Sequence, residues 1–376
     1  MGRRVNGEGS VYRRKDGRWV AVIPLEDGKK KFIYRKTQRE AIKELQLANQ
    51  AKMQGTFITA GEQTLEVFLT RWLQDTAQPN VRPRTFIRYR ELIQLHILPV
   101  LGKVKLQKLS PQHLQKLYNQ KLEQGSAPQS VKHMHRLLHK TLNDAVKWNL
   151  VARNVCDAVE APRVPKMEMK VLNGEQAQKF LETAKGDPLE ALYVLALTTG
   201  MRRGELLGLK WEDIDFLHGQ LQVQRTIARI ADKGFVVSEP KTPKSRRSIH
   251  LASIAIEALK HHRILQHEIR LLAGPSWDEQ GWVFCNALGR PIEAGNMLRR
   301  SFLPLLAKAG LQKIRFHDLR HSAATLLLST GTHPKIVQEL LGHSQISMTL
   351  DTYSHVLPSL QEDAVNRLNS LLTGHS

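Results

Sequence analysis

The sequence predicts an α+β protein of several domains, because three kinds of pattern follow one another along its 376 residues. Short β-rich runs between Asp-Gly turns come first and predict a small three-stranded β-sheet with a helix after it. Apolar residues at helical spacing then predict an all-α domain, and the remainder reads as mainly α with a small β-sheet. A chain of this length is expected to form two or three domains, and we place them at residues 1–59, 60–165 and 166–376.

The first domain is predicted to be an antiparallel meander. Its three β-rich runs are separated by Asp16-Gly17 and Asp27-Gly28, dipeptides that are typical of tight hairpin turns. Thr37 precedes Glu40 by three residues, which is the spacing of a capping box at the start of a helix. The many basic residues form either a solvated face or a surface for the DNA major groove, which admits a β-ribbon. The candidate DNA-binding residues of this domain are Arg13, Arg14, Arg18, Lys29 and Lys31.

The second domain is predicted to contain four or five helices. An apolar stripe at helical spacing follows Thr64, and Gly102 ends the next helix. Ser110-Pro111 places an N-cap before a proline at the first helical position, and Gly125 ends that helix. The last helix alternates basic and apolar residues, which predicts one basic surface, and the two prolines of residues 161–166 indicate a linker. The candidate DNA-binding residues on this surface are Arg84, Arg88, Lys132 and Arg136.

The third domain begins with a predicted helix after Asn173, followed by an almost wholly apolar segment that should be a buried helix ending at Gly200. From Ile254 onward the pattern is helical again, and residues 359–372 form a final amphipathic helix. The strand-like runs are residues 221–227, 234–237 and 248–251, with an exposed basic loop or hairpin between the last two.

The charge of the chain favours a polyanionic partner. It carries 56 Lys+Arg against 35 Asp+Glu, a formal net charge of +21. The excess is concentrated in residues 1–165, which hold 30 basic and 14 acidic side chains. A solvated basic surface is the alternative, but so large and uneven an excess favours nucleic acid.

Cysteine content and hydropathy exclude other classes. The chain's 2 cysteines lie far apart and outside any CxxC motif, so we expect neither a disulfide framework nor a zinc site. No segment approaches the roughly 20 apolar residues of a membrane span, and the N-terminus lacks the apolar core of a signal peptide. We therefore expect a soluble protein in the cytoplasm.

Short motifs near the C-terminus carry the candidate chemistry. HDLR places His317 and Arg320 three residues apart, LGH contains His343, and Tyr353 follows ten residues later. Upstream, TGMRRGEL places Arg202 in a sharp turn. Arginines and histidines around one tyrosine are suited to hold a phosphodiester and to attack it with a phenolic oxygen.

Each motif alone is weak, and only their combination and order are specific. HxxR also occurs at His133 and His267, so that spacing by itself means little. The TGMRRGEL arginine could be a solvated side chain at a helix junction, and His343 a structural histidine at a helix end. Tyr353 differs from the other tyrosines because it alone lies downstream of all the motifs.

TGMRRGEL, PKTPKSRRSIHL, HDLRHSAATLLLSTG and LGHSQISMTLDTYSHV resemble the signature motifs of the tyrosine recombinases, specifically the integrases of phages and integrative elements. The resemblance extends over essentially the whole chain. It implies a lambda-like arrangement: an arm-type DNA-binding domain in residues 1–59, a core-type DNA-binding domain in 60–165, and a catalytic domain with a C-terminal tail helix in 166–376. It implies a site-specific recombinase that integrates and excises a prophage or conjugative transposon through a 3′-phosphotyrosyl intermediate.

The resemblance also implies a role for each residue of the motifs. Tyr353 is the nucleophile, and Arg202 and Arg320 hold the non-bridging phosphate oxygens. His317 is the general base or proton relay, and His343 donates a hydrogen bond to the phosphate.

Two further roles follow from the same resemblance. Lys241 corresponds to the hairpin lysine that protonates the departing 5′ oxygen, and Lys244, three residues later, is the competing candidate. Glu205 corresponds to an acidic residue that orients the side chains of the site. No cofactor, ATP or metal ion is expected, since guanidinium groups neutralise the charge that Mg²⁺ neutralises in two-metal nucleases.

The expected partners are double-stranded DNA attachment sites, three further copies of the chain in a homotetramer, a DNA-bending accessory protein and an excision factor. No membrane partner is expected, and the host is a bacterial cell in which the protein associates with the nucleoid. The final amphipathic helix packs either on a neighbouring protomer or on its own domain. Three other readings stay open: a non-catalytic DNA-binding regulator of the same fold, a relaxing enzyme similar to type IB topoisomerases, and a metal-dependent transposase.

Overall fold

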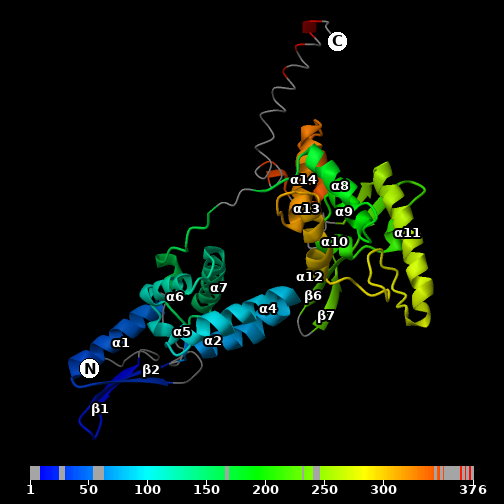
Figure 1. The fold of residues 1–376 in the computed structure, drawn as a ribbon. Helices are drawn as coiled ribbons and strands as arrows, with labels where there is room; N and C mark the ends of the chain where they lie inside the picture. The colour runs from blue at the N-terminus through cyan, green and yellow to red at the C-terminus, as the bar shows by residue number, and fades with distance from the viewer. Residues whose placement is uncertain are drawn as a thin grey trace. The chain divides into compact units, whose positions relative to one another are not determined.

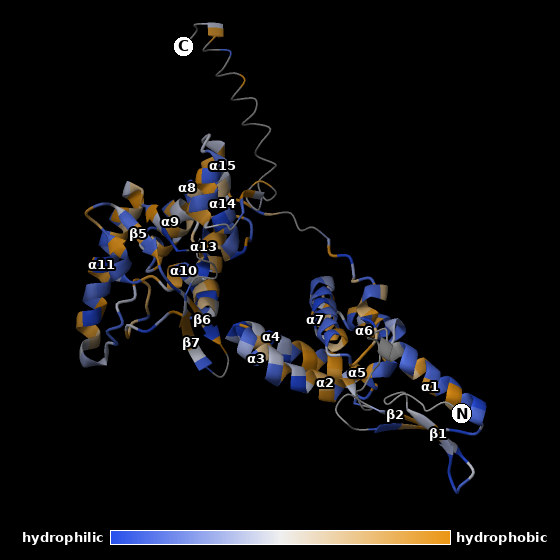
Figure 2. Cartoon of the chain, turned by 180° about the vertical axis from the view of Figure 1, so that it is seen from behind, coloured by the Kyte–Doolittle hydropathy of each residue, from blue (hydrophilic) through white to orange (hydrophobic). Residues whose placement is uncertain are grey.

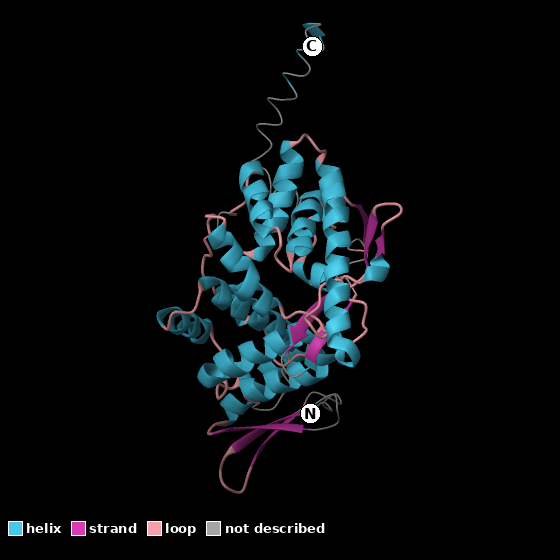
Figure 3. Ribbon diagram, turned by 45° about the vertical axis from the view of Figure 1, so that its right-hand side comes forward, coloured by secondary structure: helices cyan, strands magenta, loops and turns pink. Residues whose placement is uncertain are grey.

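The computed structural model shows a predominantly helical chain with small sheets, which confirms the predicted α+β class (Figures 1 and 3). It describes residues 9–24, 30–53, 63–165, 169–230, 233–239, 246–342 and 345–347, with isolated positions up to residue 373. By their internal contacts the residues fall into two compact units, Met1–Lys166 and Met167–Ser376.

The first unit begins with an antiparallel sheet in the order β1-β2-β3. Its strands are β1 (Ser10–Arg13), β2 (Trp19–Pro24) and β3 (Lys30–Arg35). The predicted turn at Asp16-Gly17 is confirmed: Gly17 has a φ of +84°, and its N–H donates to the Arg14 carbonyl over 3.0 Å. The turn predicted at Asp27-Gly28 lies outside the described residues.

Helix α1 (Gln38–Met53) packs against this sheet. The predicted capping box begins it: the Glu40 N–H donates to the Thr37 hydroxyl over 3.3 Å, and the Thr37 N–H donates to the Glu40 carboxylate over 3.2 Å. Ala41 and Ala48 are buried on the same face of α1, and residues 20–23 of β2 are all buried. The sheet and its helix therefore share a small apolar core.

Four long helical segments follow, within the four or five that the sequence predicts. They are α2 (Leu65–Trp72), which runs through a π-helical turn into α3 (Gln78–Asn80); α4 (Pro83–Glu91), which runs likewise into α5 (Leu98–Leu101); α6 (Pro111–Glu123); and α7 (Pro128–Lys147). The helix predicted after Thr64 is present, and the Thr64 side chain caps it by accepting from the Val67 N–H over 3.4 Å. Hydrophobic residues of α2 and α5, orange in Figure 2, contribute to a core in which Trp72 and Leu138 are buried.

The second unit is built around α9 (Glu190–Thr199), a helix that is buried on nearly all sides. The helix predicted after Asn173 is present as α8 (Gly174–Ala184), and the Asn173 side chain caps its start by accepting from the Gln176 N–H over 2.8 Å. Gly200 ends α9 in the left-handed region with a φ of +60°, and a Cβ at this position would lie 2.6 Å from the Leu341 side chain. The other helices are α10 (Arg203–Leu207), α11 (Ser253–Ala273), α12 (Ala294–Met297), α13 (Leu303–Lys308), α14 (Phe316–Ser329) and α15 (Pro334–Leu341).

The strand prediction for this unit is wrong in one respect. The run at 221–227 is divided between β5 (Gln220–Val223) and β6 (Thr226–Ile230), which belong to different sheets. Between the two strands lies Arg225, whose guanidinium forms ion pairs with the carboxylates of Glu212 and Asp213. The first sheet has the order β4-β5-β8, with β4 (Ile214–Asp215) and β8 (Arg247–His250); β6 pairs with β7 (Gly234–Ser238).

The helical prediction beyond Ile254 is also only partly right. Residues 277–293, between a short 3-10 turn and α12, contain neither helix nor named strand, and they bury Trp282, Val283 and Phe284 under α11. The segment after HDLR forms two helices, and Gly331 (φ +82°) turns the chain between α14 and α15. The basic loop of residues 240–245 and all but isolated positions of the final helix lie outside the described residues. Within the described ranges, no helix has the length and hydrophobicity to cross a membrane.

Candidate active site

Arg202 lies where α9 gives way to α10, and Glu205 holds it there. The Arg202 backbone N–H donates to one carboxylate oxygen of Glu205 over 3.0 Å, and its Nη1 donates to the other over 2.8 Å. Glu205 is buried, with 4% of its side chain exposed, whereas the Arg202 side chain is 37% exposed. The carboxylate therefore fixes a guanidinium group that still reaches the surface.

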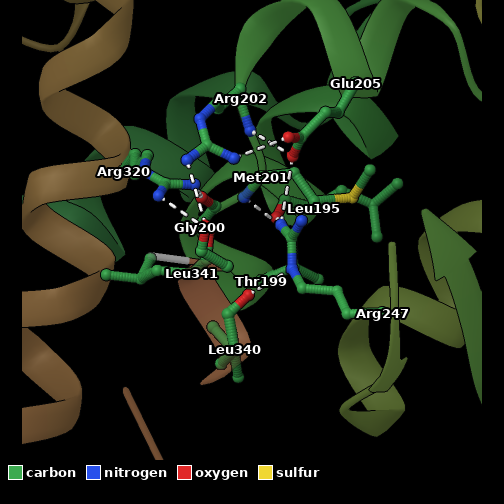
Figure 4. A network of polar contacts seen from close by, with 11 residues as sticks. Leu195, Thr199, Gly200, Met201, Arg202, Glu205, Arg247, Arg320, Leu340 and Leu341 are labelled. Atoms are coloured by element: carbon green, nitrogen blue, oxygen red, sulfur yellow. Dashed lines mark hydrogen bonds and ion pairs between the residues drawn. The ribbon is translucent and has the colours of Figure 1, made fainter. Parts of the chain in front are cut away.

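Arg320 approaches the same turn from α14. Its side chain is buried, its Nη1 donates to the Gly200 carbonyl over 2.8 Å, and its Nη2 donates to the Leu341 carbonyl over 2.8 Å (Figure 4). Gly200 is two residues before Arg202, so one main-chain turn connects the two predicted arginines. A guanidinium group is suited to this task because its donors form a rigid planar fork.

A third arginine, Arg247, joins them and was missed by the sequence analysis. It is the first residue of β8, and 7% of its side chain is exposed. Its Nη2 donates to Glu205 over 3.0 Å and its Nε donates to the Leu340 carbonyl over 2.6 Å. The sequence gives little reason to single out Arg247, because it follows several other basic residues. What distinguishes it is that it begins a strand.

Arg202, Arg247 and Arg320, here called the arginine cluster, bind three consecutive carbonyls at the end of α15. The carbonyl of residue 340 accepts from Arg247, that of 341 from Arg320, and that of 342 from Arg202 over 3.3 Å. The last carbonyls of a helix have no partner within the helix and carry partial negative charge. The cluster thus satisfies a helix end while placing three positive charges beside it.

One carboxylate, that of Glu205, offsets part of the positive charge of the cluster. Burial acts to raise the pKa of Glu205, but Arg247 and Arg202 outweigh it and hold that pKa below its usual range. Glu205 is therefore ionised at neutral pH, and the cluster together with Glu205 keeps a net positive charge suited to a phosphate.

His317 lies one helical turn before Arg320 on α14. Burial, with the nearby His321 and Arg320, lowers the pKa of His317 to about 4. The His317 and His321 rings meet edge to face with centroids 5.0 Å apart. His317 also lines an open cavity of about 540 Å³ together with Arg203 and Arg315. It is thus a neutral imidazole at pH 7, beside cationic side chains.

The structure brings together part of the predicted site. Arg202, Glu205 and Arg320 meet in one hydrogen-bonded network, and His317 shares a helix with Arg320. Lys241, Lys244, His343 and Tyr353 lie outside the described residues, so their predicted roles stay predictions.

The predicted DNA-binding residues of the first unit lie at its surface. Arg13, Arg14, Arg18, Lys31, Arg84, Arg88 and Arg136 are exposed, Lys132 is half-buried, and Lys29 lies outside the described residues. The guanidinium groups of Arg14 and Arg18 lie over the Tyr34 ring, 5.5 and 5.6 Å from its centroid. Lys132 and Arg136 are four residues apart on α7, so they share one face of that helix.

Comparisons with known proteins agree with these features. Residues 170–359 match the phage integrase family, and residues 64–122 match the phage integrase N-terminal SAM-like domain. The chain is 34% identical to the "Tyrosine recombinase XerC-like" protein of Caldanaerobacter subterraneus subsp. tengcongensis over 372 residues, 94% of this chain and 95% of the relative.

Two solved structures have a similar fold. The Tn1549 transposon integrase in complex with transposon right end DNA aligns with a TM-score of 0.69 at 22% identity, covering 81% of this chain and 99% of that one. A lambda integrase tetramer bound to a Holliday junction aligns with a TM-score of 0.58 at 22% identity, covering 93% and 96%.

The fold and the arginine-rich site define an enzyme that breaks and rejoins DNA, and the chain belongs to the phage integrase family. Within that family it is a tyrosine recombinase that performs site-specific recombination for a mobile element.

Proposed function

We propose that this recombinase cleaves each DNA strand by attack of the Tyr353 hydroxyl oxygen on a backbone phosphorus. The bond from phosphorus to the 5′ oxygen breaks, a 3′-phosphotyrosyl bond forms, and the 5′ oxygen leaves as a hydroxyl after taking up a proton. The energy of the phosphodiester is retained in the new bond, so a 5′ hydroxyl from another duplex can reverse the step and join new strands. No ATP is consumed.

The arginine cluster is the observation that carries this proposal. A phosphodiester is a poor electrophile because its anionic oxygens repel a nucleophile. Arg202 and Arg320, joined through the Gly200 turn, offer planar and permanent positive charge to the non-bridging oxygens. His343 follows directly after residue 342, whose carbonyl accepts from Arg202, and we assign it a hydrogen bond to the same phosphate.

The proton transfers are assigned to His317 and a lysine. A phenol with an ordinary pKa near ~10 needs its proton removed or its anion stabilised, and a neutral His317 can accept that proton. Lys241 delivers the proton to the departing 5′ oxygen, with Lys244 as the competing candidate.

The low pKa of His317 predicts the pH dependence of cleavage. Because this pKa is about 4, His317 stays neutral, and its contribution to the rate stays constant, as the pH falls from 8 to 6. The rate falls only when the pH approaches that pKa and the imidazole becomes protonated. The measurement is the rate of covalent complex formation at limiting DNA against pH, since this rate reports the free enzyme.

His317→Gln is the control, and it should abolish this acid limb while lowering the rate at every pH. A wild-type rate that titrates near the ordinary histidine pKa of ~6.5, in a way that the His317→Gln variant does not, would count against a buried neutral base.

We assign the DNA partners to separate parts of the chain. Residues 1–59 form the arm-type DNA-binding domain, residues 60–165 the core-type domain, and residues 166–376 the catalytic domain with its tail helix. Four protomers act on two double-stranded attachment sites and exchange one strand pair at a time, with a DNA-bending protein and an excision factor setting direction. The lambda integrase relative was solved as a tetramer on a Holliday junction, which supports this assembly. The place of action is the nucleoid in the cytoplasm of a bacterial host.

Covalent capture tests the proposed function. The protein is incubated with DNA of its source organism in EDTA and denatured, and protein-linked DNA is isolated and sequenced. We expect recurrent ends at a small number of sites, because guanidinium groups rather than a metal neutralise the phosphate. Loss of all linked DNA on chelation would contradict the mechanism and favour a metal-dependent transposase. Supercoil relaxation without recombinant joints would favour an enzyme of the topoisomerase kind.

A further inference from the structure

Arg247 occupies the centre of the polar network without being one of the residues that the resemblance assigns to the chemistry. Its Nη2 contacts the Oε2 of Glu205 over 3.0 Å, and its Nε contacts the Leu340 carbonyl over 2.6 Å. Figure 4 shows the side chain reaching from its strand to Glu205. One buried guanidinium thus joins a strand, the carboxylate under Arg202 and the end of α15.

We propose that Arg247 is a positioning residue, which holds Arg202 and the C-terminal end of α15 in the one geometry that the cleavage step needs. The inference rests on the proposed function, since it concerns the site formed around Arg202. Arg247 itself is not assigned a contact with DNA, and it acts through Glu205 and through the main chain at residues 340–342.

The first link runs through Glu205. The Oε2 atom of Glu205 accepts from both Arg247 and the Arg202 backbone N–H, while Oε1 accepts from the Arg202 guanidinium. Without Arg247 the buried carboxylate would keep a single ionic partner, and it would move toward Arg202 or recruit water. Either change displaces the guanidinium group that is to hold the phosphate.

The second link runs through α15. Among the described residues, Leu341 packs in a small apolar cluster apart from the main core of the unit, with Ala324, Leu328 and Val337 buried and Leu327 and Leu340 partly buried. So small an apolar contact leaves the helix end dependent on its polar contacts. Gly342, in the left-handed region with a φ of +65°, lies so close to Arg247 that an added Cβ would be 3.1 Å from Nη1. Arg247 therefore restricts the position of the main chain at Gly342, the residue directly before His343.

A third consideration is the place of Arg247 in the sequence. It begins β8 directly after the basic loop, six residues beyond Lys241 and three beyond Lys244. The same side chain therefore anchors the end of the segment that carries both candidate general acids. Arg247 thus contacts groups next to Arg202 and to His343, and it follows the loop of the two candidate lysines.

The alternative is that Arg247 only stabilises the fold, as many buried ion pairs do. The two roles differ in what a substitution changes. A stabilising role predicts a lower melting temperature with a normal cleavage rate for the molecules that stay folded. A positioning role predicts a slower chemical step in folded protein that binds DNA normally.

The test uses the full-length protein and DNA sites recovered by covalent capture with the wild type. Arg247→Met, Arg247→Lys and the neighbouring Arg246→Met are compared for DNA affinity, melting temperature and single-turnover cleavage at saturating DNA. Arg246 is the matched control because its side chain is 60% exposed and its ion pair with Glu239, itself 78% exposed, lies at the surface. Arg247→Lys guards against misfolding, since it keeps the charge but cannot reach two acceptors with a planar fork.

We expect Arg247→Met to cleave about 100-fold more slowly at unchanged DNA affinity, as a displacement of roughly 1 Å can cause, and Arg247→Lys to be intermediate. Arg246→Met should match the wild type. The double variant Glu205→Gln with Arg247→Met should be little slower than the slower single variant, since both act on Arg202.

Three results would overturn the inference: wild-type cleavage by both Arg247 variants, a rate loss that adds fully to that of Glu205→Gln, or a loss confined to melting temperature. Failure of the wild type itself to form covalent complexes would instead reject the proposed function, so the two failures are distinguishable.

Discussion

Replacing Tyr353 with Phe should abolish covalent attachment to DNA and leave DNA binding intact. The substitution removes one oxygen atom, so every basic residue that contacts the phosphate backbone remains. The loss of covalent complex should be at least about 10⁴-fold, because loss of a nucleophile stops the first chemical step. The measurement is the yield of denaturation-resistant protein–DNA complex on captured sites, with affinity measured in parallel.

Tyr89→Phe is the matched control for this experiment. Tyr89 lies in α4, and its ring packs 5.9 Å from that of Trp72, a contact that phenylalanine preserves. The control should cleave as the wild type does. If Tyr353→Phe still forms the covalent complex, the nucleophile is misassigned and another tyrosine carries the reaction.

Arg320→Ala and Arg202→Ala should both stop cleavage but differ in their effect on stability. Loss of a charged donor to the transition state costs about 10²–10³-fold in rate, and both variants should show at least this loss. Arg320→Ala also leaves the buried carbonyls of Gly200 and Leu341 without that donor, each at a cost of about 1–3 kcal/mol in the free energy of unfolding. Arg202 is partly exposed, and Glu205 keeps Arg247 as a partner when Arg202 is removed.

Denaturant unfolding and single-turnover cleavage, measured on both variants, check this contrast. Arg202→Ala should unfold close to the wild-type midpoint and Arg320→Ala well below it, with both binding DNA. Equal stability of the two variants would show that the contacts of Arg320 to the main chain contribute little to the fold.

The sequence predicted the elements whose signals are local. The capping box at Thr37, the helix start at Asn173, the Asp-Gly turn before Arg18 and the buried helix ending at Gly200 are all present, because each depends on residues within a few positions of one another. The division of residues 221–227 between two sheets was not predictable, since alternation shows that a strand exists and says nothing about its partner.

The same distinction applies to the site. Arg202, His317 and Arg320 stand in short motifs whose spacing is informative, and their presence in one unit follows from the order of those motifs. Arg247 could not be singled out, because its importance comes from contacts to Glu205 and Leu340, which lie 42 and 93 residues away in the chain. In the sequence, an arginine that will be buried cannot be distinguished from its exposed neighbours.

The hydrogen bonds from the arginine cluster to the end of α15 limit how this segment can vary among homologues. The three acceptors are main-chain carbonyls of residues 340–342, and every residue type supplies one. Apolar replacements at 340 therefore leave the hydrogen bonds intact, whereas inserting or deleting one residue in α15 rotates each carbonyl away from its arginine by about 100°. Side-chain identity can therefore vary at residue 340, whereas Gly342 is restricted by its φ of +65° and by Arg247, and a change in the length of α15 is not tolerated.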